Sequence, residues 1–291
     1  MDYVKPAEVL ESMVEAGTAK AEMSASQMLM RGFLGGGILA FATTLAYTAT
    51  TQTSLALTGA IIFPIGFVII VLLGLELVTG SFALIPLSVF KRKTSLSRML
   101  ANYGLVIIGH LIGCAVYAAL YGMAVTKMGT DMTNPLAQML IQVSETKTLG
   151  YQKMGFDGIV LVFIKAILCN WMVTLGVVMA MTSKSTLGKI VAMWLPILMF
   201  FEQGFEHAVV NMFVIPAGMM LGADVSVADW WLWNQIPVLL GNFVGGALFT
   251  GFMFYWSHNK KAKDSESSSS SSSAKSGLPA KPALAAEKSG L

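Results

Sequence analysis

The 291-residue sequence is poor in charge, since only 12% of its residues are Asp, Glu, Lys or Arg while 55% are hydrophobic. This composition excludes an ordinary water-soluble globule, in which about a quarter of the residues are charged. The two cysteines, Cys114 and Cys169, lie inside apolar runs, which excludes a disulfide framework or a cysteine-based zinc site. No Gly-x4-Gly-Lys-Ser/Thr sequence is present, and the net charge is only +3. We therefore expect neither ATP-driven chemistry nor a nucleic-acid partner.

The two ends of the chain differ from its middle. Residues 1–28 predict an amphipathic N-terminal helix, and they lack the basic-then-apolar pattern of a secretory signal. Residues 257–291 contain several lysines and a run of serines from Ser267 to Ser273, which predicts a disordered cytoplasmic tail. Between them, residues 29–256 are predicted to form a transmembrane domain.

Six apolar stretches occupy this middle region: 31–50, 55–90, 99–123, 157–182, 188–222 and 233–256. One membrane crossing needs about 20 apolar residues, so four stretches fit one helix each. The second and fifth, about 35 residues long, contain glycine and polar residues near Glu76 and near Glu206. Irregular backbone inside a membrane needs partners from protein or a cavity, so we expect both helices to be broken and to face the interior.

Basic residues predict how these helices are oriented. The segments after the second and fourth stretches carry Lys91, Arg92, Lys93, Arg98, Lys184 and Lys189, whereas residues 50–55 and 222–230 contain no Lys or Arg. Short loops rich in Lys and Arg stay on the cytoplasmic side. Six crossings with both termini cytoplasmic satisfy this rule, and the long loop at 124–156 is then placed outside. The cell membrane is the expected location, with an organelle membrane as the alternative.

A repeated pattern relates the two halves of the chain. Residues Gly74, Glu76 and Pro86 recur 130 positions later as Gly204, Glu206 and Pro216, and residues Asn102, Gly109 and Gly113 recur 132 positions later as Asn234, Gly241 and Gly245. Each half has three crossings, an odd number, so the second half is expected to be inverted relative to the first. Inverted repeats with paired broken helices are typical of channels and transporters, whose site lies near the membrane midplane.

His207 is the strongest candidate for that site. Ionisable groups inside a membrane are rare and mark transport pathways. A neutral imidazole donates a hydrogen bond to a small anion, and a charged one attracts the anion or transfers a proton to it. The alternative is that His207 satisfies buried carbonyl groups at the break. Glu206 either holds a ring nitrogen of His207 or has a structural role, and Glu76 is expected to satisfy amides of its own loop.

Other residues near the breaks are candidates for lining a path. Thr79 and the free backbone amides of the breaks suit anions. Nearby apolar side chains are candidates for narrow dry gates, with ordinary packing as the alternative: Phe63, Phe67, Leu77, Val78 and Phe200. Asn170 and Asn242 are expected to link the two halves through amide hydrogen bonds. Lys165 and His110 are interpreted as structural.

Two alternatives belong to other functional classes. Residues Gln203 to His207 resemble an inverted zinc-protease motif without its first histidine, which suggests a membrane-embedded hydrolase. Alternatively, Glu202, Glu206 and His207 would bind a divalent cation in a metal carrier. The hydrolase lacks one of its three zinc ligands, and the metal carrier has no equivalent ligands in the first half. We therefore expect no enzyme activity, no cofactor and no metal site.

Several motifs resemble those of the formate–nitrite transporter family. They are Gly204-Phe205-Glu206-His207, Asn211-Met212-Phe213, Glu76-Leu77-Val78-Thr79-Gly80, Ile167-Leu168-Cys169-Asn170-Trp171, and Ile236-Pro237 with Gly241-Asn242. The resemblance covers about residues 5–256. It implies an all-α membrane protein with an aquaporin-like fold of six helices, assembled as a homopentamer in which each subunit has its own pore. It also implies passage of small monovalent anions such as formate, nitrite, hydrosulfide, lactate or bicarbonate.

The resemblance assigns roles by position. His207 matches the central pore histidine of the family, and Thr79 matches its threonine on the first broken loop. Leu77 and Val78 match a Leu-Phe pair that forms the inner gate with Phe67, while Phe63 and Phe200 match the outer gate. Lys153 matches the vestibule lysine that attracts anions. We therefore expect a channel or proton-coupled transporter for formate, nitrite or both.

Overall fold

The computed structural model describes residues 2–259, and this part of the chain is helical apart from one isolated β-bridge between Tyr3 and Ser183. The elements follow in the order α1 (Pro6–Ala21), α2 (Ala25–Thr53), α3 (Ala56–Ile62), α4 (Pro64–Leu72), α5 (Val78–Phe90), α6 (Leu96–Val125), α7 (Pro135–Lys147), α8 (Leu149–Gln152), α9 (Phe156–Met181), α10 (Thr186–Glu202), α11 (Ala208–Met220), α12 (Val227–Trp230), the π-helix η1 (Trp231–Gln235), α13 (Ile236–Val244), the π-helix η2 (Gly245–Phe252) and α14 (Met253–His258).

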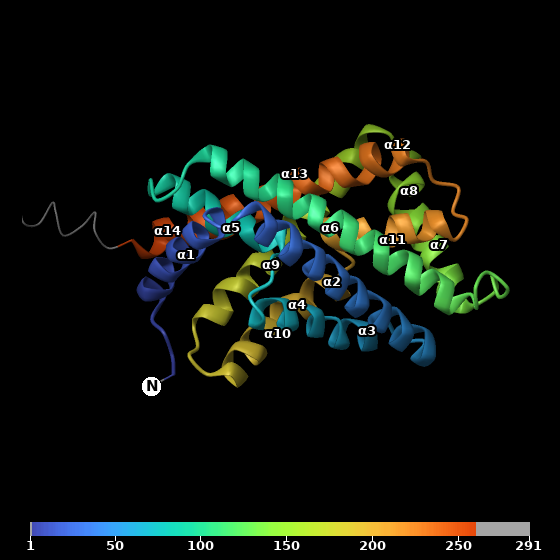
Figure 1. Cartoon of the computed structure of the whole chain (residues 1–291), viewed down its shortest axis with the longest axis horizontal. Coiled ribbons are helices and arrows are strands. Elements are labelled where there is room, and N and C mark those ends of the chain that lie inside the picture. Colours follow the sequence, from blue (N-terminus) through green and yellow to red (C-terminus); the bar gives the residue numbers. More distant parts are fainter. Residues whose placement is uncertain (1, 260–291) are drawn as a thin grey trace, which may run out of the picture.

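Four helices in the described part are long and apolar enough to cross a membrane. They are α2, α6, α9 and the continuous segment Val227–His258, with 29, 30, 26 and 32 residues. At about 1.5 Å of rise per residue, each exceeds the roughly 30 Å of a hydrocarbon layer. Figure 1 shows α6 and the segment Val227–His258 running along the longest axis of the molecule. Many large hydrophobic side chains on α2 and α6 are exposed, and these apolar outer faces suit contact with lipid.

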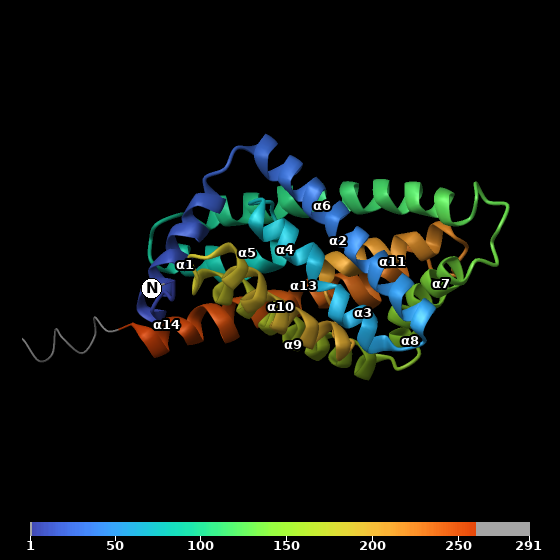
Figure 2. The same ribbon diagram turned by 90° about the horizontal axis from the view of Figure 1, so that it is seen from below.

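The two 35-residue stretches are each interrupted between two helices. We call residues 73–77, between α4 and α5, the first break, and residues 203–207, between α10 and α11, the second break. Each contains a glycine with positive φ, Gly74 at 63° and Gly204 at 61°, a conformation that residues with a Cβ rarely adopt. From the middle of the molecule, α5 runs towards the end that holds the N-terminus and α11 towards the opposite end (Figures 1 and 2).

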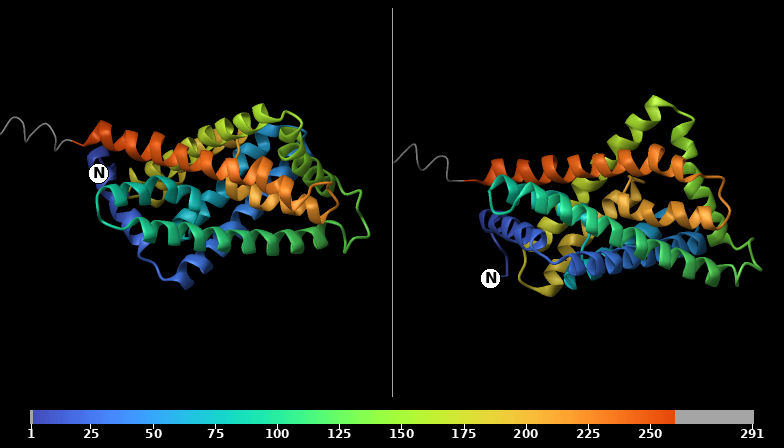
Figure 3. Two further views of the ribbon diagram at one scale, coloured as in Figure 1. Left: turned by 90° about the horizontal axis from the view of Figure 1, so that it is seen from above. Right: turned by 45° about the horizontal axis from the view of Figure 1, so that its top comes forward.

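The N-terminal helix is shorter than the sequence predicts. It ends at Ala21, and a new helix begins at Ala25 because Ser24 and Gln27 form a reciprocal capping box. Ahead of α1, the Val4 amide donates to the Thr182 carbonyl at 2.7 Å, so the N-terminal residues pair with the α9–α10 connection. Figure 3 shows α1 and α14 at the same end of the molecule. The last helix extends to His258, and the remainder of the predicted tail, from residue 260, lies outside the described residues.

The segment 124–156, which the sequence predicts as a long loop, contains α7 and α8. Asn134 caps α7 by accepting the Leu136 amide at 3.0 Å, and Pro135 occupies the first helical position, where its missing N–H costs nothing. Helix α7 packs on α11 as α1 packs on α5. Ser88 of α5 donates to the Val14 carbonyl at 2.7 Å, and Ser144 of α7 donates to the Ile215 carbonyl at 3.1 Å. Each half therefore has a short helix, α1 or α7, packed on the helix that follows its break, α5 or α11. We call α5 and α11 the half-helices.

The residues that repeat in the sequence make the same contacts in both halves. The Asn102 side-chain amide donates to the Lys20 carbonyl and that of Asn234 donates to the Lys147 carbonyl, both at 2.9 Å. The paired glycines allow close helix packing, since a Cβ on Gly109 or Gly113 would strike the backbone of α2 and one on Gly241 or Gly245 that of α9. The spacing in the sequence thus reflects contacts that hold each half together.

Candidate functional site

The N-termini of the two half-helices meet in the middle of the molecule. The Nε2 atom of His207 lies 3.0 Å from the Thr79 hydroxyl, although the two residues are 128 positions apart. His207 also caps α11, because its Nδ1 atom accepts the Val210 amide at 3.3 Å. The Nε2 atom then carries the proton and donates it to Thr79. The ring is almost completely buried, with 3% of its surface exposed.

Aromatic rings cover the histidine. Phe200 stacks on the His207 ring at 5.6 Å between centroids, and Phe63 meets Phe200 edge-on at 5.8 Å. Phe63 also stacks on Phe201 at 3.9 Å. Since Phe63 and Phe200 are both buried, the sequence-predicted pair lies together directly beside the imidazole.

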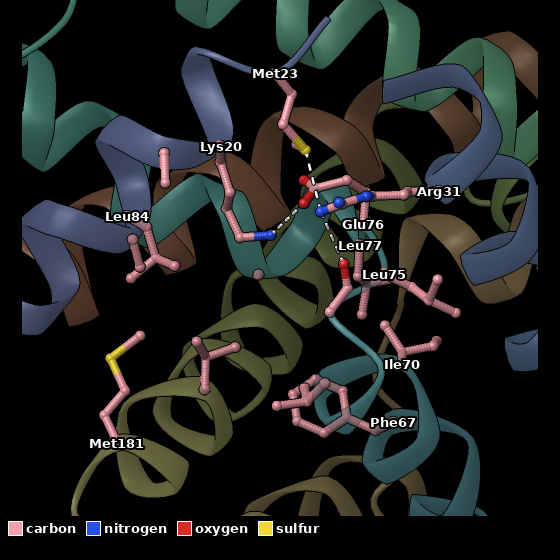
Figure 4. Close-up of a pocket in the computed structure, with 16 residues that line it drawn as sticks. Lys20, Met23, Arg31, Phe67, Ile70, Leu75, Glu76, Leu77, Leu84 and Met181 are labelled. Atoms are coloured by element: carbon pink, nitrogen blue, oxygen red, sulfur yellow. Dashed lines mark hydrogen bonds and ion pairs between the residues drawn. The ribbon is translucent and has the colours of Figure 1, made fainter. Parts of the chain in front are cut away.

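A cavity of about 320 Å³ lies on the α1 side of the first break, and we call it the Lys20 cavity. Its polar lining consists mainly of Lys20, Arg31 and Glu76. The Lys20 Nζ atom lies 2.7 Å from Glu76, and Arg31 donates to the Gly74 carbonyl at 3.2 Å (Figure 4). Because two cations and one carboxylate line the Lys20 cavity, its net charge is positive, which favours anions.

The predicted inner-gate residues lie in or beside this cavity. Phe67 and Leu77 line it, and both are buried. Figure 4 shows Phe67 across the cavity from Lys20 and Glu76. Val78 is fully buried at the start of α5 and does not belong to the cavity lining. The structure therefore brings two of the three residues, Phe67 and Leu77, together in the lining of the cavity.

Glu206 is held away from the histidine beside it in the sequence. Its carboxylate accepts hydrogen bonds from Lys147 and Tyr151 at 2.7 Å and from Asn211 at 2.8 Å. Of the roles considered for Glu206, the hydrogen bonds agree with the structural one, because His207 bonds to Thr79 and Val210 rather than to Glu206. In the first break Glu76 likewise accepts from Lys20, and from Ser81 at 3.4 Å, rather than from the amides of its loop.

The lysine that contacts the second break is Lys147 and not Lys153. Lys147 is the last residue of α7, and its Nζ atom lies 2.7 Å from Glu206. Lys153 follows the short helix α8 and is exposed. The intervening residues turn through Thr148 into α8, so only the folded chain decides which lysine reaches the break.

Two asparagines connect the halves. The Asn170 amide donates to the Thr79 carbonyl at 3.0 Å and to the Asn242 carbonyl at 2.6 Å. The Asn242 side chain accepts the Ala208 amide at 2.9 Å and donates to the Glu206 carbonyl at 2.9 Å. The start of α11 and the residue that faces His207 are thus fixed by one buried amide network.

His110, which the sequence indicates to be structural, forms hydrogen bonds at the first break. Its Nε2 atom accepts the Val78 amide at 3.1 Å, and its Nδ1 atom lies 2.7 Å from the Gly32 carbonyl, to which it donates. Extending the repeat by one position reveals this residue, since His110 follows Gly109 as Asn242 follows Gly241.

The structure does not assemble the metal or hydrolase site considered from the sequence. Glu202 is exposed, Glu206 is saturated by Lys147, Tyr151 and Asn211, and His207 faces Thr79. Within residues 2–259 no three His, Cys, Asp or Glu side chains are grouped so as to hold a metal ion. Glu206 and His207 are adjacent in sequence but bond to different partners.

Comparison with known proteins agrees with the helical arrangement. Residues 7–256 match the formate/nitrite transporter family. The chain is 35% identical over 269 residues to the uncharacterized transporter YrhG of Bacillus subtilis, covering 90% of this chain and 96% of the relative. It is 32% identical over 274 residues to the probable formate transporter of Methanothermobacter thermautotrophicus, covering 89% and 98%.

A solved structure described as a pentameric formate channel with formate bound superposes with a TM-score of 0.66 at 25% identity, covering 81% of this chain and 98% of that one. The family match spans nearly all of the described helices, including both breaks and the four long apolar helices. The protein is accordingly a multi-pass membrane protein. The chain belongs to the formate/nitrite transporter family.

Proposed function

We propose that this protein is a homopentameric membrane channel or proton-coupled transporter that passes formate and nitrite through a pore in each subunit, with His207 at its centre. The observation that carries the proposal is the buried His207–Thr79 contact of 3.0 Å at the meeting point of two half-helix N-termini. The names of similar proteins support the substrate, since one is a probable formate transporter and one solved relative is a pentameric formate channel.

The electrostatics of this centre favour an anion. The aligned peptide dipoles of a helix place about half a positive charge at its N-terminus, and α5 and α11 direct these ends at one another. The nearby carboxylates do not oppose an anion, because Glu76 is paired with Lys20 and Glu206 with Lys147. Arg31 and Lys20 add positive charge at the mouth of the pathway.

Apolar constrictions limit what passes. Phe67, Leu77 and Val78 form the inner gate, and Phe63 and Phe200 form the outer gate on the other side of His207. Moving a bare anion through an apolar ring costs several kcal/mol, so only small monovalent ions are tolerated. Bicarbonate, lactate and hydrosulfide are the alternative substrates of the same kind.

Proton transfer removes most of this cost. A carboxylate that reaches the imidazole accepts a hydrogen bond from Nε2, the atom that otherwise donates to Thr79. Double protonation of the ring displaces the Val210 amide from Nδ1. The Nε2 proton then moves to the carboxylate oxygen, which leaves an imidazole protonated on Nδ1 alone and a neutral acid. The neutral acid crosses an apolar gate far more easily than the anion.

Topology follows from the same assignment. The chain crosses the membrane six times as an aquaporin-like inverted repeat, three crossings per half, with the two broken helices facing each other. Both termini are cytoplasmic, which places α1 and the Lys20 cavity on the inner side. The cell membrane is the proposed location. The activity is transport, with no catalytic role for Glu206 or His207.

Anion flux into proteoliposomes tests the proposal. We expect formate uptake by the wild type and its loss by at least about a hundredfold in His207→Ala, since positioned proton transfer contributes about that factor or more. His258→Ala is the matched control, because His258 lies at the end of α14, away from the breaks, and its removal leaves flux unchanged. Equal flux in His207→Ala and wild type from pH 5 to 8 contradicts the central histidine.

A competition panel identifies the physiological anion. Nitrite, bicarbonate, lactate and hydrosulfide are added separately against labelled formate at two pH values. Unlabelled formate and nitrite are expected to reduce the uptake of labelled formate most. If bicarbonate or lactate reduces it more, that anion is the substrate instead. The oligomer is checked by mass measurement of the purified protein in detergent, where five subunits are expected.

A further inference from the structure

The first amide of each half-helix is held by a side chain from a later helix. The Val78 amide, which begins α5, donates to Nε2 of His110 at 3.1 Å. The Ala208 amide, which begins α11, donates to Oδ1 of Asn242 at 2.9 Å. Both acceptor residues follow a repeated glycine and are 132 positions apart. They occupy equivalent places in the two halves but differ in chemistry.

The equivalence includes a second hydrogen bond. Nδ1 of His110 donates to the Gly32 carbonyl of α2 at 2.7 Å, and the Asn242 amide donates to the Ala166 carbonyl of α9 at 2.8 Å. Gly35 lies beside the imidazole: a Cβ there would strike the Glu76 carbonyl and would also lie 3.3 Å from Cε1 of His110. Each residue therefore ties the start of a half-helix to a long helix of its own half.

An imidazole performs this double role only in one form. Asparagine always offers one acceptor and one donor group, whereas histidine does so at these atoms only when Nδ1 is protonated and Nε2 is bare. The opposite tautomer, or the doubly protonated ring, would point an N–H of His110 at the N–H of Val78. A buried amide without an acceptor costs about 1–3 kcal/mol, so the observed contacts select the Nδ1–H tautomer.

His207 needs the reverse arrangement. Its Nδ1 atom accepts from Val210, so its proton resides on Nε2 and faces Thr79. The two histidines are joined through adjacent residues, because His110 holds Val78 and the next residue, Thr79, contacts His207. A displacement at the start of α5 therefore reaches the hydroxyl that His207 uses.

We propose that His110, as its neutral Nδ1–H tautomer, is a positioning residue that sets the start of α5, and with it the Thr79 hydroxyl, against His207. His110 in the first half corresponds to Asn242 in the second half. The expected effect of His110 on flux rests on the proposed function, whereas the assignment of its tautomer is independent of that function.

Nitrogen-15 and carbon-13 solid-state NMR of histidine-labelled wild-type protein in liposomes tests the tautomer directly. Spectra of His110→Asn and His207→Ala assign the signals by their disappearance. We expect His110 to be protonated on Nδ1 and His207 on Nε2 at neutral pH. An Nε2–H or doubly protonated His110 overturns the proposal, whatever the protein transports.

Flux of formate tests the positioning role. His110→Asn restores the groups used by Asn242 and is expected to keep flux within about threefold of wild type, whereas His110→Leu leaves the Val78 amide without an acceptor and loses about tenfold or more. Val106→Ala, one turn earlier on the buried face of α6, removes volume without a hydrogen bond and serves as the control. Wild-type flux in His110→Leu, or equal loss in His110→Asn and His110→Leu, overturns the positioning role.

Two other outcomes are separable. If the wild type passes no formate, the proposed function fails and the NMR spectrum still decides the tautomer. If His110→Leu does not assemble, the flux of His110→Asn and the spectrum of the wild type decide: a loss of flux well beyond threefold in His110→Asn contradicts equivalence with Asn242.

Discussion

The first and second breaks share a scaffold and differ in chemistry. Each contains a glycine in the left-handed region, a buried glutamate paired with a lysine from a short overlying helix, and a half-helix that starts at the centre. At the residue before that half-helix the first break has Leu77, whereas the second has His207. The backbone arrangement is thus duplicated, and the group able to exchange a proton is present on one side only.

The polar support of the two glutamates also differs. Glu206 receives hydrogen bonds from Lys147, Tyr151 and Asn211, while Glu76 receives them from Lys20 and, more weakly, Ser81. The more heavily bonded glutamate lies next to the histidine. This difference indicates that rigidity is concentrated where the imidazole has to be oriented.

The largest effect expected from this difference concerns stability. Glu206→Gln leaves Lys147 without its partner and is expected to cost about 3–5 kcal/mol, as for other buried ion pairs broken on one side. Glu76→Gln is expected to cost about 1–2 kcal/mol less, because Glu76 makes fewer hydrogen bonds at about 1 kcal/mol each. Thermal unfolding of the two variants in detergent measures the difference. Equal destabilisation would show that the second break is not the more rigid one.

A second prediction concerns Thr79, whose equivalent in the second half is Val209. Thr79→Val keeps the shape of the side chain and removes the hydroxyl that faces His207, so formate flux should fall about fivefold, the effect of one hydrogen bond of about 1 kcal/mol. Thr79→Ser retains the hydroxyl and is the control. Unchanged flux in Thr79→Val would mean that His207 works without a partner from the first half.

The smallest predicted effect concerns Val78, the first residue of α5. Val78→Phe enlarges the side chain at the proposed inner gate and should slow lactate about threefold more than formate, which corresponds to roughly 0.7 kcal/mol. Val78→Ile is the control, since it adds a single methylene. The ratio of lactate to formate flux is measured in the same vesicles. Equal slowing of both anions would argue for overpacking of a buried site rather than a steric gate.

Much of the fold follows from composition and spacing. The six apolar stretches coincide with helices, and glycine with a neighbouring glutamate marks both interruptions, because only such residues suit an unwound backbone among apolar helices. Helix α7 escapes this reasoning. It is short and partly polar, and its single clear signal is Asn134 followed by Pro135, which caps the helix. Counting only apolar runs therefore treats it as a loop.

The site is predicted less completely, since its partners come from distant parts of the chain. His207 is evident because an ionisable residue at a break is unusual. Lys147 bonds to Glu206 because α7 ends at that lysine, and the spacing of residues along the sequence does not reveal this contact. His110 bonds a backbone amide 32 residues away, so only its correspondence with Asn242 points to it.

The opposed starts of α5 and α11 have a consequence for direction. An ion at the midpoint meets the same partial charge from above and from below, so the helices create an electrostatic well but no preference for either exit. Net movement is then decided by the concentrations of anion and proton on the two sides. For the anion transport proposed above, we therefore expect the same protein to carry its substrate in either direction, without any change in its fold.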